Sequence, residues 1–165
     1  MTLETAILLV QTLVTVSIAG WLFLGAMDNY LTPSLNGGFA RSVLTFERLK
    51  EMYPDDFARV QYREIKSPAL HKTVFAVIVV SETLVCIVLF VGVYMMSRAL
   101  LGLEDPEAAR VVALLGVLGF TLIWGAFLVF GNWFLLWMCH EWAQSNHFQL
   151  LLWGIGTMLL LILGS

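Results

Sequence analysis

The sequence predicts an all-α, polytopic membrane protein with four transmembrane helices. Of its 165 residues, 59% are hydrophobic and only 13% are charged, and a soluble domain of this size would not stay dispersed in water with that balance. Four apolar stretches are long enough, or nearly so, to cross about 30 Å of hydrocarbon at about 1.5 Å per residue. The net charge of −3 and the scattered basic residues give no reason to expect a nucleic-acid partner.

The predicted spans cover about residues 5–27, 73–96, 111–131 and 145–163 of one membrane domain, residues 1–165. The first stretch is too long for a signal peptide and has no basic segment before it, so we expect it to remain as a span. The fourth apolar stretch, residues 148–163, is only sixteen residues long, so we expect its helix to begin earlier, near Trp142. An even number of spans places both termini on the same side of the membrane.

The connection over residues 28–72 is predicted to form an ordered cap, because a structureless loop of this length is uncommon in a compact protein. Apolar residues recur there at helical spacing, with charged residues between them, which predicts one short amphipathic helix on the membrane surface. The apolar set is Phe39, Val43, Leu44 and Phe46. Before it lie residues typical of turns, namely Asn29, Pro33, Asn36, Gly37 and Gly38. Pro68 is expected in the first turn of the second span. Besides a solvated cap, a docking platform for a partner remains an open interpretation.

Glu82 lies in the middle of the second predicted span and is the strongest pointer to function in the sequence. A charged carboxylate near the bilayer centre costs about 2.5 to 3.5 kcal/mol on insertion scales, so it normally has a partner, a proton or a task. His71, eleven residues earlier, lies on about the same helix face but about 16 Å away along the helix axis. Two hypotheses remain open: a neutral Glu82 that hydrogen-bonds a neighbouring helix, and a Glu82 that carries protons or binds a ligand.

The three histidines, His71, His140 and His147, are predicted to lie on the same side of the membrane, with Cys139 beside His140 in the sequence. Imidazole and thiolate groups suit zinc or copper. The spacing matches no metal-binding motif, however, so the sequence predicts neither a metal site nor a cofactor.

Three tryptophans, Trp133, Trp137 and Trp142, gather around the connection between the third and fourth spans. Their commonest role is an aromatic belt at the membrane interface, where they face lipid or a protein interface. A cradle for a quinone or a lipid headgroup is the alternative. The sequence contains no nucleophile elbow, phosphate-binding loop, dinucleotide fingerprint or zinc-protease helix, so we predict that the chain is not an enzyme.

Three groups of residues form ordered motifs along nearly the whole chain. The first is Asp28-Asn29-Tyr30, followed by Asn36, Phe39 and the run Ser42-Val43-Leu44-Thr45-Phe46-Glu47. The second is Arg63, Ile65, Pro68 and His71, followed by the span that contains Glu82. The third is Trp133-Phe134 with Trp137 and then Trp142. In these motifs the chain resembles a bacterial family of predicted small integral membrane proteins of unknown function.

The resemblance implies a four-helix fold but no activity. It marks Asn29, Asn36, Arg63, His71 and Glu82 as candidate functional polar residues. Two departures count against a metal site: Ser42 stands where the family has a histidine, and His140 and His147 have no counterpart in the family motifs.

These observations lead to a functional hypothesis: a small accessory subunit or assembly factor of a larger inner-membrane complex, such as a respiratory or other oxidoreductase. The partners would then be other integral membrane proteins and lipids. A small proton-coupled transporter or channel that uses Glu82 is the first alternative, and a metal- or quinone-handling membrane protein is the second.

The orientation in the bacterial inner membrane is open to two arguments. Residues 41–72 contain seven lysines and arginines, whereas only Arg98 and Arg110 lie on the side of the termini. The positive-inside rule would therefore place the long connection in the cytoplasm. The family resemblance implies the reverse, and we follow it in expecting both termini to be cytoplasmic.

Overall fold

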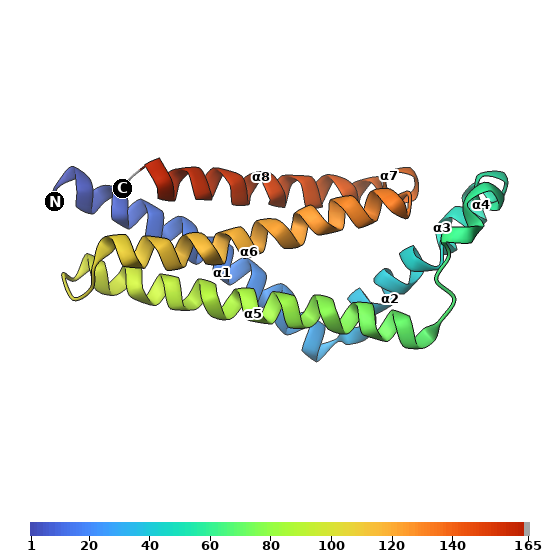
Figure 1. Cartoon of the computed structure of the whole chain (residues 1–165), viewed down its shortest axis with the longest axis horizontal. Coiled ribbons are helices and arrows are strands. Elements are labelled where there is room, and N and C mark those ends of the chain that lie inside the picture. Colours follow the sequence, from blue (N-terminus) through green and yellow to red (C-terminus); the bar gives the residue numbers. More distant parts are fainter. Residues whose placement is uncertain (164–165) are drawn as a thin grey trace.

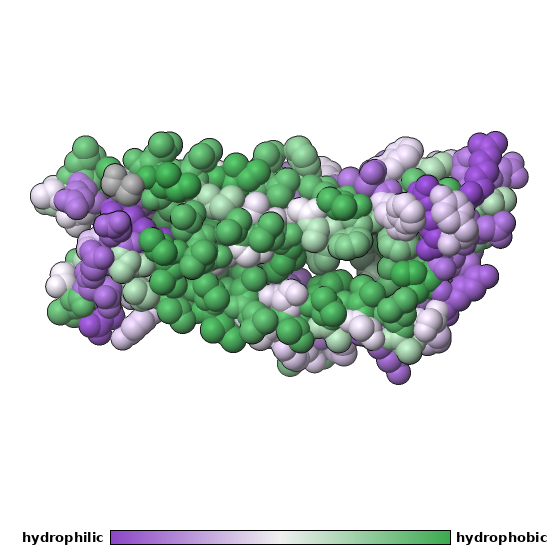
Figure 2. All heavy atoms as spheres, in the orientation of Figure 1, coloured by the Kyte–Doolittle hydropathy of each residue, from purple (hydrophilic) through white to green (hydrophobic). Residues whose placement is uncertain are grey.

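A computed structural model describes residues 1–163, and it confirms the predicted all-α fold class. Four helices are long and apolar enough to cross a membrane: α1 (Leu3–Leu31), α5 (Pro68–Leu100), α6 (Pro106–Trp133) and α8 (Glu141–Leu163). Figure 1 shows α5, α6 and α8 lying lengthwise beside one another, while α1 crosses them obliquely. In Figure 2 an apolar middle section separates two polar ends, as expected for a protein that spans a bilayer.

All four prolines of the chain begin a helix. They are Pro33, Pro54, Pro68 and Pro106. Proline suits this position because its fixed φ matches the helix and its missing N–H would have no intrahelical partner there. Side-chain caps reinforce two of these starts, since Ser67 accepts a hydrogen bond from the Leu70 N–H and Asp105 accepts from the Glu107 and Ala108 N–H groups. The expected start of the second span at Pro68 is therefore confirmed.

Small residues allow α5, α6 and α8 to pack closely. A Cβ atom added at Gly92 of α5 would lie 2.7 Å from the Ala113 Cα of α6, and one at Gly116 would lie 2.9 Å from the Leu89 Cδ2. Gly154 of α8 lies similarly close to Thr121 of α6. Without a hydrophobic force between helices in lipid, this van der Waals contact is a main source of association.

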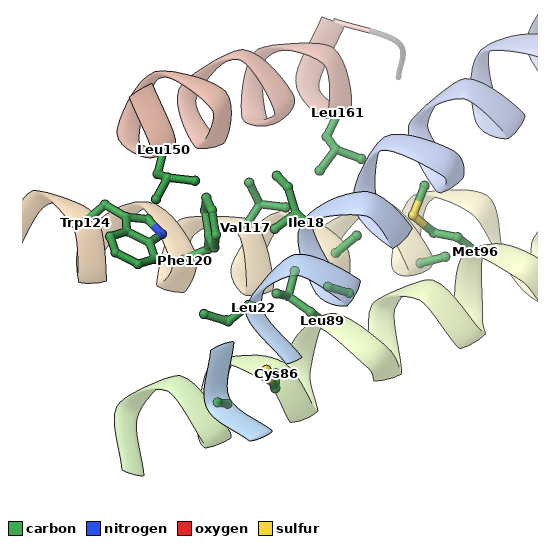
Figure 3. Close-up of a cluster of buried hydrophobic side chains, with 14 of the residues drawn as sticks. Ile18, Leu22, Cys86, Leu89, Met96, Val117, Phe120, Trp124, Leu150 and Leu161 are labelled. Carbon is green, nitrogen blue, oxygen red and sulfur yellow. The ribbon is translucent and has the colours of Figure 1, made fainter. Parts of the chain in front are cut away.

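The apolar core lies where α1 crosses the other three long helices. Figure 3 shows Ile18 and Leu22 of α1 pointing toward Leu89 of α5 and Val117 of α6, with Leu161 of α8 close by. All five side chains are almost fully buried. The core thus joins all four spans.

The long connection folds into a cap of several short elements rather than one amphipathic helix. They are α2 (Pro33–Leu44), α3 (Glu47–Met52), α4 (Pro54–Val60) and the 3₁₀ helix η1 (Gln61–Arg63). The predicted short amphipathic helix is confirmed as α2, which contains Phe39, Val43 and Leu44. It ends before Phe46, because Phe46 adopts a left-handed conformation, with φ of 54°, and separates α2 from α3. The predicted turn before this helix is wrong: α1 continues through Asn29, and residues 36–38 lie inside α2.

A small apolar cluster holds the cap against α7 (Leu136–Cys139), the short helix before α8. Phe46, Leu49 and Cys139 are its buried members, and the Phe46 ring lies 5.5 Å from that of Phe134. Leu135, which precedes α7, is also left-handed, with φ of 54°. Such backbone costs about 1 to 2 kcal/mol per non-glycine residue, and in both places it turns an apolar side chain into this cluster.

The close approach of α5 to α6 leads to a stability prediction. Gly92→Ala should destabilise the protein by about 1 to 3 kcal/mol, because the new methyl group meets the Ala113 backbone, which cannot yield as a flexible side chain would. Gly156→Ala in α8 is the matched control, since nothing lies within 4 Å of its added Cβ. Reversible unfolding of both variants in detergent measures the difference. Equal stability of the two would contradict the packing described here.

Candidate functional site

Three of the candidate polar residues meet where α1, α2 and α5 come together. Asn29 of α1 donates a hydrogen bond from Nδ2 to Oε2 of Glu82 on α5, at 2.6 Å. Asn36 of α2 donates from Nδ2 to Oδ1 of Asn29, at 2.7 Å. Asn29 and Glu82 are 5% and 6% exposed, so the contact between them is shielded from its surroundings. We call these three residues the Glu82 network.

The Glu82 network satisfies polar groups that would otherwise be stranded in an apolar setting. Asn29 uses its amide both as donor and as acceptor, so its orientation is determined by the two neighbours. The carboxyl group accepts through Oε2 only, and Oε1 has no hydrogen-bond partner among residues 1–163. The arrangement can therefore tie three helices together, and it leaves one carboxyl oxygen available for a proton or a ligand.

A second polar pair lies one residue further along both helices. The Tyr30 hydroxyl is 3.0 Å from the Thr83 Oγ1. Thr83 donates its own proton to the Val79 carbonyl, at 2.7 Å, so Tyr30 must be the donor in the pair. Thr83 thereby gives α1 and α5 another polar link beside the Glu82 network.

His71 does not take part in the Glu82 network. Its Nε2 lies 2.7 Å from the Ile65 carbonyl oxygen, and since a carbonyl only accepts, Nε2 carries the proton. The Ile65 N–H in turn donates to the Leu44 carbonyl, at 3.0 Å. His71 therefore fastens the segment between η1 and α5 to the cap, outside the span.

Arg63 joins the cap to the end of α6. Its guanidinium lies over the Trp133 ring, 4.4 Å from the ring centroid, and Nη1 donates to the Trp133 carbonyl at 3.3 Å. A cation at a helix C-terminus also interacts favourably with the helix dipole. Two candidates from distant motifs, Arg63 and Trp133, are thus brought together.

The three tryptophans of the expected belt lie at the cap end of the molecule and are half exposed or more. Trp142 packs against Phe39 of α2, with ring centroids 5.4 Å apart. Trp137 lines a shallow groove of about 330 Å³ together with residues of α6 and α8. The other lining residues are Leu128, Glu141, Gln144, Ser145, Phe148 and Gln149.

The histidines do not converge. His140 is buried against the Phe39 ring, and burial followed by the charge of Arg48 lowers its pKa. Burial also raises the pKa of the neighbouring Cys139 thiol. His147 lies instead inside α8, between the rings of Trp124 and Phe127. Within the described chain, no group of three or more His, Cys, Asp or Glu side chains is placed to hold a metal ion.

One buried polar cluster was missed by the sequence analysis. Arg110 of α6 donates from Nε to Oε1 of Gln11 on α1, at 2.9 Å, and Gln11 donates from Nε2 to the Leu160 carbonyl of α8, also at 2.9 Å. Gln11 is the signal that could have revealed it, because this amide lies inside the first apolar stretch and needs a partner there.

Comparison with protein families gives a match over residues 7–164 to a family described as predicted small integral membrane protein (DUF2165). The chain belongs to this family. The match includes all three resembling motifs and confirms the resemblance seen in the sequence. No curated protein and no solved structure matches the chain. Membership of the DUF2165 family supports an integral membrane protein and brings no activity with it.

The Glu82 network leads to a prediction that tests whether Glu82 stabilises the fold through its hydrogen bond to Asn29. Glu82→Gln keeps an acceptor for Asn29, so the free energy of unfolding should change by no more than about 1 kcal/mol, in line with intramembrane hydrogen bonds. Glu82→Leu should cost more because it strands the Asn29 amide in an apolar setting. Unfolding in detergent or bicelles measures both variants. A Gln variant as unstable as the Leu variant would rule out hydrogen bonding as the role of Glu82.

Proposed function

We propose that this chain is a small accessory subunit or assembly factor of a larger inner-membrane complex. Its surface, rather than a pocket or a catalytic centre, would then carry the function. A respiratory or other oxidoreductase complex is the first class to test. This proposal rests on how the four spans divide their side chains between interior and exterior.

The observation that carries the proposal is the large apolar exterior of a thin bundle. In the most apolar part of each span, only 22% to 39% of residues are buried within the protein. The outward side chains include bulky ones that are 44% to 64% exposed. Examples are Phe23, Phe90, Tyr94, Leu122 and Phe130. Large, irregular side chains of this kind give a neighbouring helix more surface for van der Waals packing than a smooth helix would.

The interior supports the same proposal because its polar groups are engaged locally. The buried hydroxyls of Thr12, Thr15, Thr121 and Thr157 each donate to the carbonyl four residues earlier in their own helix. A transport path would need several polar groups facing a common water-filled space. In residues 1–163 the Glu82 network is confined to one end of α1 and gives no such series.

The proposal predicts stable association with another membrane protein. Gentle extraction from native membranes, with the chain expressed at its natural level, should give a particle well above 18.5 kDa of polypeptide that contains at least one different integral membrane protein. Identification of the co-purified chains, with a non-homologous four-span protein of similar abundance as control, provides the test. A monodisperse monomer or a pure homo-oligomer would contradict the accessory role.

We also propose that the chain lies in the bacterial inner membrane with both termini in the cytoplasm and the cap outside. Cysteine labelling in intact cells tests this orientation. In a background without Cys86 and Cys139, a cysteine at Asp55 of the cap should react with an impermeant maleimide. A cysteine at Asp105 should react only after lysis. Asp105 caps α6, so its replacement would disturb the start of that helix. Leu103→Cys, in the same connection between α5 and α6, therefore serves as a second reporter. The opposite labelling pattern would support the orientation given by the positive-inside count.

A further inference from the structure

Arg110 is a buried cation at the end of the bundle that holds the described N-terminus and the end of α8. It lies in the second turn of α6, about 6 Å along the axis from Pro106. Only 9% of its surface is exposed, although arginine is almost never buried without a partner. The environment of this guanidinium therefore requires an explanation.

The guanidinium is held in one orientation by a chain of two hydrogen bonds. The Gln11 amide is fixed by its bond to the Leu160 carbonyl in the last turn of α8. The Gln11 Oε1 then accepts from Nε of Arg110, the nitrogen nearest the aliphatic stem. Gln11 is itself fully buried, so these bonds are protected from exchange with solvent.

The other end of the guanidinium has no partner. Neither Nη1 nor Nη2 of Arg110 makes a hydrogen bond with residues 1–163, and Nη2 is enclosed whereas Nη1 is not. Nor does any described acidic residue form an ion pair with Arg110. The acidic residues at this end of the molecule are Glu4, Glu104, Asp105 and Glu107. Two of them are engaged elsewhere, because Glu104 lies 3.8 Å from Arg98 and Asp105 caps α6.

An oriented guanidinium whose Nη1 is accessible and unbonded in the described chain is suited to binding an oxyanion. This nitrogen can donate to a phosphate or carboxylate oxygen, and charge-assisted bonds of this kind are among the strongest hydrogen bonds in proteins. A phosphate oxygen that reaches the accessible Nη1 would neutralise a charge that is shared over the whole planar group. Burial of an uncompensated charge is costly, so binding an anion would also stabilise the fold.

The position of Arg110 points to lipid as the source of the anion. It lies one turn inside the start of α6, a helix long and apolar enough to cross a membrane. In a bilayer, this end of the helix would lie near the phospholipid phosphates. The next residue, Val111, is half exposed on the surface of the span, beside the space that an acyl chain would fill. A soluble anion would offer the phosphate but no apolar group for this surface.

We propose that the accessible Nη1 of Arg110, whose guanidinium is oriented by Gln11, binds the phosphate of an anionic phospholipid in the leaflet on the side of the termini. Acidic residues outnumber arginines and lysines at this end, since Arg98 and Arg110 are its only basic side chains. Nonspecific electrostatic attraction of anionic lipid to this end is consequently weak. Anionic lipid that stays bound to the purified protein at this end is therefore evidence of a specific site. This inference does not depend on the proposed accessory role.

Lipid titration of the purified full-length chain tests the site. Native mass spectrometry counts phosphatidylglycerol bound to the wild type and to Arg110→Gln, with phosphatidylcholine as the reference lipid. We expect Arg110→Gln to weaken phosphatidylglycerol binding at least about tenfold, the effect of losing a charge-assisted hydrogen bond. Arg98→Gln is the matched control, because it removes an arginine at the same end that already faces Glu104, and its binding should match the wild type.

A second variant protects the test against misfolding of Arg110→Gln. Gln11→Glu loses the bond that the amide donates to the Leu160 carbonyl, but it places a carboxylate beside the guanidinium within the chain. It should therefore abolish preferential phosphatidylglycerol binding while the protein remains folded by size-exclusion chromatography. A large excess of inorganic phosphate should not compete with the lipid. Competition by phosphate would reassign the site to a soluble anion. Equal lipid binding by the wild type, Arg110→Gln and Gln11→Glu would overturn the proposal. It would also be overturned if Arg110→Gln bound lipid normally but no longer co-purified with a partner protein.

Discussion

In the hydrocarbon of a bilayer no water is available for a buried polar group, so every such group must find its partner within the protein. This constraint explains most of the polar contacts in the four spans. Threonine hydroxyls return to their own helices, the Glu82 carboxyl is bonded by Asn29, and Gln11 is bonded at both ends of its amide. The Arg110 Nη2 and the His147 Nδ1 are buried without a hydrogen-bond partner in the described chain. At these two places the constraint is not met within the chain, and a group from outside it would have to supply the partner.

The same constraint determines how α1 is held. α5, α6 and α8 pack on one another through small residues such as Gly92, Gly116 and Gly154. In contrast, α1 crosses them obliquely (Figure 1) and buries apolar side chains from Leu8 to Ala26. Its two amide side chains, Gln11 and Asn29, are eighteen residues apart, about 27 Å along the helix. Each joins α1 to a different neighbour, Gln11 to α6 and α8, and Asn29 to α5 and α2. Polar bonds toward both ends thus add to the apolar contacts in determining the position of α1.

The sequence was sufficient for the four spans because their length and apolar composition leave no soluble alternative, and it identified Glu82 because a lone carboxyl in such a stretch is conspicuous. It could not show that Asn29 and Asn36 are the partners of Glu82, since those residues looked like turn formers and only the packing of α1 and α2 on α5 brings them together. The prediction that Phe46 belongs to the same helix as Phe39 and Val43 failed for a similar reason. The helical spacing of Phe46 is real, but burial against Phe134 favours a left-handed backbone that local preference disfavours. Gln11 inside the first apolar stretch indicates that a partner is needed, but Arg110 lies near the end of a span, where polar residues are usual, so the sequence did not show that the two pair.

The geometry of the Glu82 network bears on whether its carboxyl works as a proton carrier. Asn29 bonds to Oε2, so a proton can be added to or removed from Oε1 without breaking the network. The same hydrogen bonds can therefore form with Glu82 protonated or ionised, and a change of protonation does not by itself move the helices. A carrier also needs a next group, and the ionisable residue on the same helix face, His71, has its Nε2 proton engaged by the Ile65 carbonyl. Within the described chain, Glu82 has the properties of a helix fastener at the point where α1 passes into the cap. Because Asn29 also bonds Asn36, the Glu82 network holds α2 in position. The position of α2 in turn determines which surface the cap exposes.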